Sequence, residues 1–472
     1  IGKSTNTATV QFLDDWSVGG DLTVHGPAEV VNSITTDGSQ TWHGDVNVVG
    51  FTENVAFTAT AGDVVFEGDL LAGARAEDRA DLLSLETGSE GAWRVPLGVT
   101  GLKIWAVGAG GGGAGASRGR DEDEGVWNDR WPGSGGGAGA VTYIDLDKDE
   151  LDLLNLANVD YVIGAGGNGA NGRRNGIDGG DTTVTLTDSN QLLAGGGGGG
   201  VNSNRYEVGF SDSPSSRRDG GQGEGGDYRI QGGDGGWTAH EDGGGGGGGI
   251  GSYRGDSGYN WVGGDGAHSR NFKELNAALE LVNQRRADDN QVPLTSTSSG
   301  PQATGIGEDA KIFGGGGAGG STTSSSSYIN TGGDGLYGGG GGGAGTWDTD
   351  ERGGDGGDGA VVLRYTLAPQ SVTIDAGDDV RVGGKLTGKS VTINTGDTPD
   401  GGTDNADGSY IAGTVDVGDD AADAFTKQGI GTLELRSDND FDATTRVEAG
   451  TLQLGNGGTT GSLSSNTIEL DD

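Results

Sequence analysis

Acidic side chains are the residues of this chain whose type and spacing could support binding chemistry. The densest loop holds Asp397, Asp400, Asp404 and Asp407 around Asn405. Carboxylate and amide oxygens at this density are the ligands that Ca²⁺ prefers. We name these four aspartates as candidate metal ligands and Ca²⁺ as the candidate cofactor. The alternative, which we favour, is a solvated acidic turn.

Patterns for catalysis are weak throughout the chain. The four histidines, His25, His43, His240 and His268, are scattered and show no metal or triad spacing. There is no cysteine, which excludes thiol chemistry and disulfides, and no G-x-x-x-x-G-K-[ST] phosphate loop. Some β-helices cleave polysaccharides with paired carboxylates, but 70 acidic residues make any single pair uninformative. We expect that the chain is not an enzyme.

The charge balance limits the classes of partner. The 70 acidic residues face only 29 basic ones, which gives a net charge of −41. Nucleic-acid phosphates and anionic lipids would be repelled by such a surface. No apolar run approaches the roughly 18 residues of a membrane span. We therefore expect neither nucleic-acid binding nor membrane insertion. Because the sequence starts at Ile1 and contains no methionine, we interpret it as a mature or internal segment of an exported protein.

The N-terminal region predicts short stacked strands. The tripeptide Gly-Asp-(Leu/Val) starts at Gly20, Gly44 and Gly68, with a spacing of 24 both times. Alternating apolar residues accompany each copy, and alternation bounded by Gly, Asp and Asn is typical of strands and turns. A unit of about two dozen residues has the size of one β-helix coil, which must stack on neighbours to bury its inner face.

The same pattern returns near the C-terminus. Residues 371–374 and 390–393 repeat Ser-Val-Thr-Ile at a spacing of 19, and 376–378 repeats the Ala-Gly-Asp of 61–63. We infer one parallel β-helix, interrupted by a long insertion. The predicted domains are N-terminal coils in 1–90, the insertion in 91–367 and C-terminal coils in 368–472.

The insertion is dominated by glycine. Residues 108–359 hold 74 of the 105 glycines, and strand patterns at 102–107 and 360–365 bracket them. A flexible linker is one interpretation. The other is an ordered block of extended three-fold helices of the polyglycine II type, hydrogen-bonded side by side, where any Cβ would prevent close approach. Large residues that punctuate the glycine runs favour the ordered block.

Two segments read as short helices. Residues 75–86 combine leucines with acidic neighbours, and residues 271–288 place apolar side chains at i, i+3 and i+4. We expect the second helix to pack on the glycine-rich block rather than in a partner's groove. The predicted fold class is thus all-β, a parallel β-helix at both ends with a polyglycine-II-type insertion and one or two short helices.

Two motifs resemble known families of surface proteins. Residues 427–435 and 444–456 follow K-x-G-x-G-T-L-x-L and T-x-V-x-A-G-T-L-x-L-G-N. This pattern resembles the passenger-associated repeat of autotransporter adhesins. Residues 34–44 and the coils after them are similar to filamentous-haemagglutinin-like β-helices. Both resemblances imply a right-handed parallel β-helix in a large bacterial protein that is extracellular or displayed on the cell surface.

The glycine-rich block resembles the tip domain of phage tail-fibre adhesins. The resemblance rests on the order of its elements, at residues 107–113, 161–167, 193–195 and 356–362. It implies a polyglycine sandwich whose variable loops contact a partner. The corresponding loops here are 118–131, 202–218 and 321–330.

These patterns favour a structural role. We expect a segment of a large extracellular bacterial filament or adhesin that self-assembles through stacked β-solenoid coils and carries a lateral glycine-rich domain. Stacking would occur between copies or as the continuation of a longer chain. The alternative is an adhesin module that binds a cell-surface receptor or glycan through loops of the glycine-rich domain.

Overall fold

The described part of the chain divides into two compact units. One unit comprises Ile1–Glu77, Pro96–Thr100 and Thr366–Asp472, and the other comprises Asp78–Val95 and Gly101–Tyr365. We call them the solenoid unit and the glycine-rich unit. The computed structural model describes residues 1–2, 8–49, 54–73, 76–84, 89–96, 98–119, 129–154, 158–172, 174–187, 190–201, 220–235, 247–250, 272–288, 313–320, 331–345, 351–396, 408–465 and 467–471.

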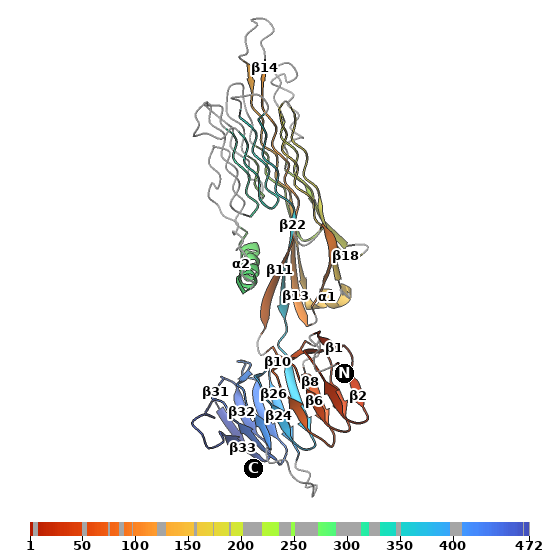
Figure 1. The fold of residues 1–472 in the computed structure, drawn as a ribbon, viewed down its shortest axis with the longest axis vertical. Coiled ribbons are helices and arrows are strands. Elements are labelled where there is room, and N and C mark those ends of the chain that lie inside the picture. The colour runs from red at the N-terminus through yellow and green to blue at the C-terminus, as the bar shows by residue number, and fades with distance from the viewer. Residues whose placement is uncertain are drawn as a thin grey trace. The chain divides into compact units, whose positions relative to one another are not determined.

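The solenoid unit is a parallel β-helix, as its sequence predicts. Successive coils each contribute strands to three parallel sheets, so that strands close in space come from different coils (Figure 1). The first sheet contains β1 (Val10–Phe12), β4 (Ala28–Val30), β7 (Val46–Val48), β10 (Leu70–Ala72), β25 (Leu386–Gly388) and β28 (Val415–Val417).

The other two sheets run along the same stack of coils. The second contains β2 (Trp16–Val18), β5 (Ile34–Thr36), β8 (Asn54–Ala59), β23 (Ser371–Ala376), β26 (Val391–Thr395), β29 (Ala424–Gln428), β32 (Thr444–Val447) and β35 (Thr467–Leu470). The third contains β3 (Leu22–Val24), β6 (Gln40–Trp42), β9 (Val64–Phe66), β24 (Val380–Val382), β27 (Ser409–Ile411), β30 (Thr432–Leu435) and β33 (Thr451–Leu454). A short pair is formed by β31 (Asn439–Asp440) and β34 (Leu463–Ser464).

The insertion lies within one coil and leaves the stack continuous. The backbone N–H of Gln370 donates to the carbonyl of Gly73 at 2.9 Å, which closes the coil across the insertion. Strand β23 then pairs in parallel with β8, and β24 with β9. This pairing confirms the interpretation that N-terminal and C-terminal coils form one solenoid.

One predicted coil spacing is wrong. Leu22 pairs with Gln40, and Val46 pairs with Ala28, so the first coils advance by 18 residues rather than 24. A step of 24 residues first occurs at the following coil, from Gln40 to Val64 and from Val46 to Leu70. The Gly-Asp-(Leu/Val) copies at 20 and 44 precede strands of different sheets, because the same turn chemistry serves more than one corner of the coil.

That turn chemistry is a hydrogen bond from one coil to the next. The carboxylate of Asp21 accepts the backbone N–H of Ser39 at 2.8 Å, that of Asp45 accepts the N–H of Asp69 at 3.0 Å, and that of Asp69 accepts the N–H of Lys385 at 2.7 Å. Turn N–H groups that lack a ladder partner are thereby satisfied. This explains why aspartate recurs at the start of these strands.

The glycine-rich unit begins in ordinary antiparallel sheets. One sheet has the order β11 (Glu77–Leu83), β22 (Ala360–Leu367), β13 (Val99–Val107), β16 (Val141–Asp147) and β21 (Tyr228–Ile230). The other has the order β12 (Glu90–Arg94), β17 (Asn158–Val162), β18 (Thr182–Thr187), β19 (Asn190–Ala194) and β20 (Gly223–Glu224). The strand patterns predicted at 102–107 and 360–365 are confirmed by β13 and β22.

Beyond these strands, hydrogen bonds between glycine segments repeat every three residues. In the segment 108–116, the backbone N–H groups of Gly108, Gly111 and Ala114 donate to the segment 133–140. The next residues of each triplet donate to the segment 174–180, and the third residues donate to 351–357. One residue in three therefore points to the same neighbour, whereas a β-strand would alternate between two sides.

Each inner segment has six neighbours. Segment 108–116 also accepts hydrogen bonds from the segments 167–170, 197–200 and 341–344. All its residues up to Ala116 are buried. A Cβ placed on Gly113 would lie 1.9 Å from the carbonyl oxygen of Gly342. Glycine is required here because backbones surround the segment on every side.

Aspartate side chains accept hydrogen bonds from backbone N–H groups at the outer surface of the packed glycine segments. The carboxylates of Asp178 and Asp181 accept the N–H groups of Gly199 and Gly196 at 2.7 and 2.8 Å. Asp355 and Asp358 accept N–H groups of the segment 166–169 in the same way. The three-residue spacing of each pair matches the backbone repeat. Part of the acidity of the chain is therefore structural.

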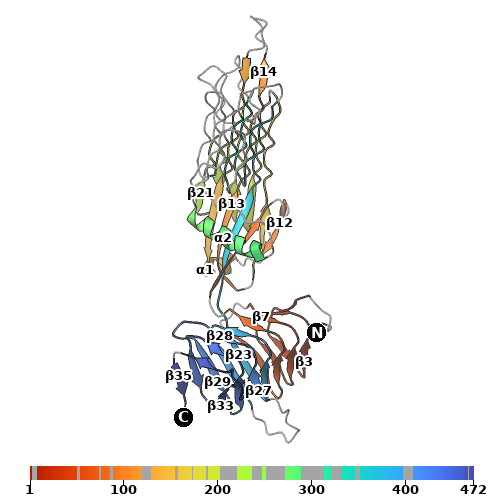
Figure 2. The same cartoon turned by 60° about the vertical axis from the view of Figure 1, so that its left-hand side comes forward.

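The second predicted helix is confirmed and the first is wrong. Helix α2 (Lys273–Asp288) buries Leu275, Ala278 and Leu279 in an apolar cluster of the glycine-rich unit (Figure 2). Residues 77–83, predicted as helix, form the edge strand β11, because pairing with β22 overrides helix propensity. Asp78 of this strand forms an ion pair with Arg364 at 2.7 Å.

A helix that the sequence analysis missed is α1 (Lys148–Leu154). Its signal is a reciprocal cap: the Glu150 N–H donates to Asp147 at 3.0 Å, and the Asp147 N–H donates to Glu150 at 3.1 Å. Neither helix in the described ranges is long and apolar enough to span a membrane.

Candidate functional sites

The open ends of the coil stack are the first candidate site. One inward-facing column of side chains passes through every strand of the second sheet, from Trp16 to Leu470. Its middle members are fully buried: Ile34, Phe57, Ile374, Ile393 and Lys427. Its two end members are exposed, by 41% for Trp16 and 71% for Leu470. Apart from Lys427 the column is apolar, and no described strand covers it beyond β2 or β35.

The C-terminal coil extends this apolar surface. Ile468 is 57% exposed although it occupies the column of Thr445 and the fully buried Phe425. Leu454, at the edge of the third sheet, is 47% exposed although it pairs with the buried Leu435. These side chains have the positions of core residues, and no further described coil packs against them.

Lys427 is a charged residue inside the same core column. Its Nζ donates hydrogen bonds to the backbone carbonyls of Gln428, Gly429 and Ala449, of which the Gly429 contact measures 2.8 Å. Gly429 has a φ of +73°, which favours glycine. Burial lowers the pKa of Lys427 to about 8. The lysine and glycine of the K-x-G motif therefore stabilise a turn between two coils.

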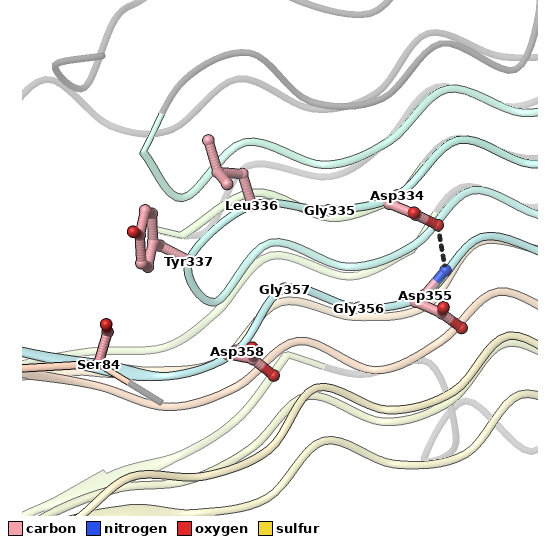
Figure 3. Close-up of a pocket in the computed structure, with 9 residues that line it drawn as sticks. All are labelled: Ser84, Asp334, Gly335, Leu336, Tyr337, Asp355, Gly356, Gly357 and Asp358. Atoms are coloured by element: carbon pink, nitrogen blue, oxygen red, sulfur yellow. Dashed lines mark hydrogen bonds between the residues drawn. The ribbon is translucent and has the colours of Figure 1, made fainter. Parts of the chain in front are cut away.

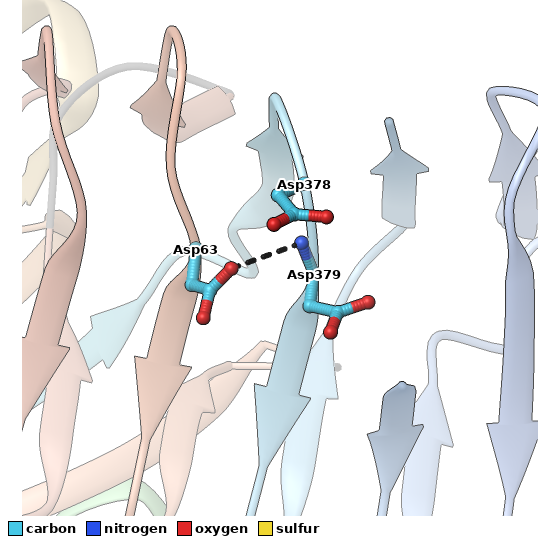
Figure 4. Close-up of side chains that lie close together, drawn as sticks. All are labelled: Asp63, Asp378 and Asp379. Carbon is cyan, nitrogen blue, oxygen red and sulfur yellow. Dashed lines mark hydrogen bonds between the residues drawn. The ribbon is translucent and has the colours of Figure 1, made fainter. Parts of the chain in front are cut away.

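A group of three aspartates is the second candidate site. Carboxylate oxygens of Asp63, Asp378 and Asp379 lie within 4.8 Å of one another, a spacing that could hold a cation (Figure 4). They come together because Asp63 precedes β9 and the other two precede β24, its neighbour from the far side of the insertion.

Arg381 pairs with two of the three carboxylates in this group. Its guanidinium lies 2.7 Å from Asp379 and 3.3 Å from Asp63. Burial opposes ionisation of Arg381, but the hydrogen bond that it donates to Asp379 and the charge of Asp63 outweigh this effect and raise the pKa of the arginine. Asp63 also accepts the backbone N–H of Asp379 at 3.2 Å. The arrangement joins two coils electrostatically, and the guanidinium offsets one of the three negative charges.

The candidate Ca²⁺ ligands Asp397, Asp400, Asp404 and Asp407 lie outside the described residues. So do loop residues 202–218 and 321–330, together with 120–128 of the first loop. The ends of that first loop pair as the antiparallel strands β14 (Ser117–Gly119) and β15 (Asp129–Trp131).

Two of the four histidines are described. The rings of His25 and His43 stack with centroids 4.4 Å apart, and His43 Nδ1 lies 2.7 Å from a carboxylate oxygen of Glu67. They follow β3 and β6 on adjacent coils. The two rings thus stack on each other, and His43 in addition contacts a surface carboxylate.

Each of the two units contains a region that matches a known protein family. Residues 425–454 match the passenger-associated-transport-repeat, which indicates an autotransporter-like passenger that is secreted or displayed on the cell surface. No curated protein matches the chain. Residues 86–366 match the glycine-rich domain, and this match covers more than half of the 472 residues. The chain therefore belongs to the glycine-rich domain family.

Proposed function

We propose that the chain is a self-assembling structural segment of an extracellular bacterial filament or adhesin. The observation that carries the proposal is the apolar core column that is buried in the middle of the coil stack and exposed at Trp16 and Leu470. In the proposed filament, the first coil of a second copy covers the last coil of the preceding one. Such a head-to-tail contact does not close on itself and therefore builds a fibre.

The unpaired edges of the sheets support the same contact. Strand β35 ends the second sheet and β2 begins it, so each presents backbone groups without a ladder neighbour among the described strands. Fully burying one Leu or Ile side chain contributes about 1.5–3 kcal/mol. The exposed parts of Leu454, Ile468 and Leu470 would then contribute about 3–5 kcal/mol. Association costs about 4 kcal/mol or more, so assembly should depend strongly on concentration.

For the glycine-rich unit we propose packing of the polyglycine II type. The support is the three-residue hydrogen-bond repeat and the six neighbours of the segment 108–116. We propose a scaffold rather than an enzyme, and the support is the scattered spacing of the four histidines and the lack of cysteine in the sequence. With a net charge of −41, nucleic acid and anionic lipid remain excluded as proposed partners.

The test is sedimentation velocity over a wide range of concentrations, with and without a calcium chelator. We expect the wild type to form a growing series of oligomers. Leu470→Asp should raise the concentration at which oligomers form at least about tenfold, because a charge would be buried in the contact between two copies. Ile177→Asp is the matched control, since Ile177 is 57% exposed in the glycine-rich unit and the charge change is the same. A wild type that stays monomeric at every concentration would refute filament assembly.

A further inference from the structure

One position on the outer layer of the glycine-rich unit departs from the aspartate pattern. Segments 334–338 and 355–358 run in step, because the N–H groups of Gly335 and Gly338 donate to the carbonyls of Asp355 and Asp358, both at 2.8 Å. The N–H of Asp355 donates to the carboxylate of Asp334 at 2.7 Å. Three residues further on, the corresponding side chain is Tyr337, which has no carboxylate.

The backbone N–H of Asp358 therefore lacks the cap that the repeat provides elsewhere. No residue in the described ranges accepts a hydrogen bond from it. The carboxylate of Asp358 itself is turned to another segment, where it accepts the N–H of Gly166 at 2.8 Å (Figure 3). This position offers a hydrogen-bond donor to an incoming group.

A cavity of about 260 Å³ lies at this position. Tyr337 and Leu336 lie at one end of it and Asp334 and Asp355 at the other (Figure 3). Tyr337 has a φ of +38°, an unfavourable backbone for this residue. Its ring stacks on Phe313, with centroids 4.9 Å apart and planes 19° apart. The tyrosine ring is thus held in place by its stacking on Phe313.

The polar groups restrict the class of ligand. The donor at Asp358 requires an acceptor atom, which a simple cation lacks. The carboxylates of Asp334 and Asp358 would repel an anion, whereas that of Asp355 is paired with Arg352. A hydroxyl group satisfies both, because it accepts from an N–H and donates to a carboxylate. Tyr337 and Leu336 add an apolar surface for C–H groups. A polyol with one apolar face combines these properties.

We propose that this cavity binds one neutral sugar unit of a carbohydrate. One sugar hydroxyl accepts the Asp358 N–H, another donates to the carboxylate of Asp334, and the apolar face of the ring packs on Tyr337. This site lies on the segments themselves, not on the variable loops, and it is independent of coil stacking. Failure of filament assembly would leave it untouched.

The test is saturation-transfer NMR on the full chain with the methyl glycosides of glucose, galactose, mannose and N-acetylglucosamine. We expect at least one of them to give a saturable signal. Tyr337→Asp supplies the missing carboxylate to the Asp358 N–H, as Asp334 does for Asp355, and should leave the thermal midpoint unchanged or raised. It should weaken sugar binding at least about fivefold. The aromatic ring on which the sugar packs is removed, and the Asp358 N–H is bonded to the new carboxylate.

Two controls make the outcome decisive. Tyr228→Asp changes another exposed tyrosine of the same unit by the same charge, and it should bind as the wild type does. If Tyr337→Asp fails to fold, Tyr337→Asn replaces it, since asparagine tolerates the left-handed backbone. The proposal is overturned if no glycoside binds, or if Tyr337→Asp binds normally. It is also overturned if arginine methyl ester binds there instead and is displaced by salt.

Discussion

A single added methyl group at Gly113 should destabilise the glycine-rich unit severely. A Cβ on Gly113 would lie 1.9 Å from the oxygen and 2.5 Å from the carbon of the Gly342 carbonyl. The carbonyl must therefore move by more than about 1 Å to reach an ordinary contact. Gly342 donates to Gly333 and accepts from Gly354, both at 2.8 Å, and this movement breaks both hydrogen bonds.

The expected cost of Gly113→Ala is about 3–9 kcal/mol, the sum of overpacking and two lost hydrogen-bond partners. Overpacking contributes about 1–3 kcal/mol, and each buried backbone group left without a partner adds about 1–3 kcal/mol. The matched control is Gly101→Ala, where the nearest atom to the added methyl is the Leu146 oxygen at 3.9 Å. That change should stay within about 1 kcal/mol of the wild type.

Hydrogen exchange followed by mass spectrometry separates this effect from the solenoid unit. Amides in 338–345 and 351–359 should exchange far faster in Gly113→Ala, because their opening free energy falls by the stated amount. Amides in the strands of the solenoid unit serve as the internal reference. The reasoning would be refuted if Gly113→Ala and Gly101→Ala showed the same opening free energy within about 1 kcal/mol.

Three further changes test the chemistry that joins coils and segments. Because burial lowers the pKa of Lys427 to about 8, the folded chain releases this proton at lower pH than the unfolded chain, and the cost of burying the charge is then removed. Chemical denaturation should show that the free energy of unfolding of the wild type, relative to Lys427→Met, rises from about pH 8 up to the ordinary pKa of lysine. A difference in unfolding free energy between the two proteins that does not change with pH would contradict this. Asp69→Ala should destabilise the solenoid unit by about 0.5–1.5 kcal/mol, whereas Asp69→Asn, which keeps an acceptor for the Lys385 N–H, should cost less; equal thermal midpoints would count against the cap. Asp178→Ala should accelerate exchange of the Gly199 amide at least about tenfold relative to Asp178→Asn, and equal rates would show that the carboxylate does not protect it.

Much of the solenoid could be predicted from its sequence because one inner face is buried. Alternation in segments such as 371–376 requires one set of side chains to face the core, and the structure buries Val372 and Ile374. The repeated Ala-Gly-Asp correctly indicated that coils on both sides of the insertion are neighbours. Coil length was less predictable, since Asp21 and Asp45 use the same cap at different corners.

The pairing of glycine segments could not be read from the sequence. A glycine has no side chain to distinguish its neighbours, so Gly110, Gly111 and Gly112 look alike although they donate to three different segments. The sequence also gave no sign that Lys427 points into the core, because its acceptors are backbone carbonyls. That Tyr337 occupies the position of a capping aspartate can be recognised only once the structure shows that it lies beside the segment 355–358.

Intermolecular cross-linking tests the stacking of copies most directly. If the core column continues from Leu470 of one copy to Trp16 of the next, Asp471 and Ser17 become register neighbours at about 5 Å. The native chain has no cysteine, so Ser17→Cys/Asp471→Cys introduces the sole thiols.

On oxidation, stacked copies should form a disulfide-linked ladder in denaturing electrophoresis, because that distance permits a disulfide. In the control Thr35→Cys/Asp471→Cys, Thr35 lies one coil further, at about 10 Å, and no ladder should form. A ladder in the first variant alone is the predicted result. Only monomers, or equal ladders in both variants, would contradict the proposed filament.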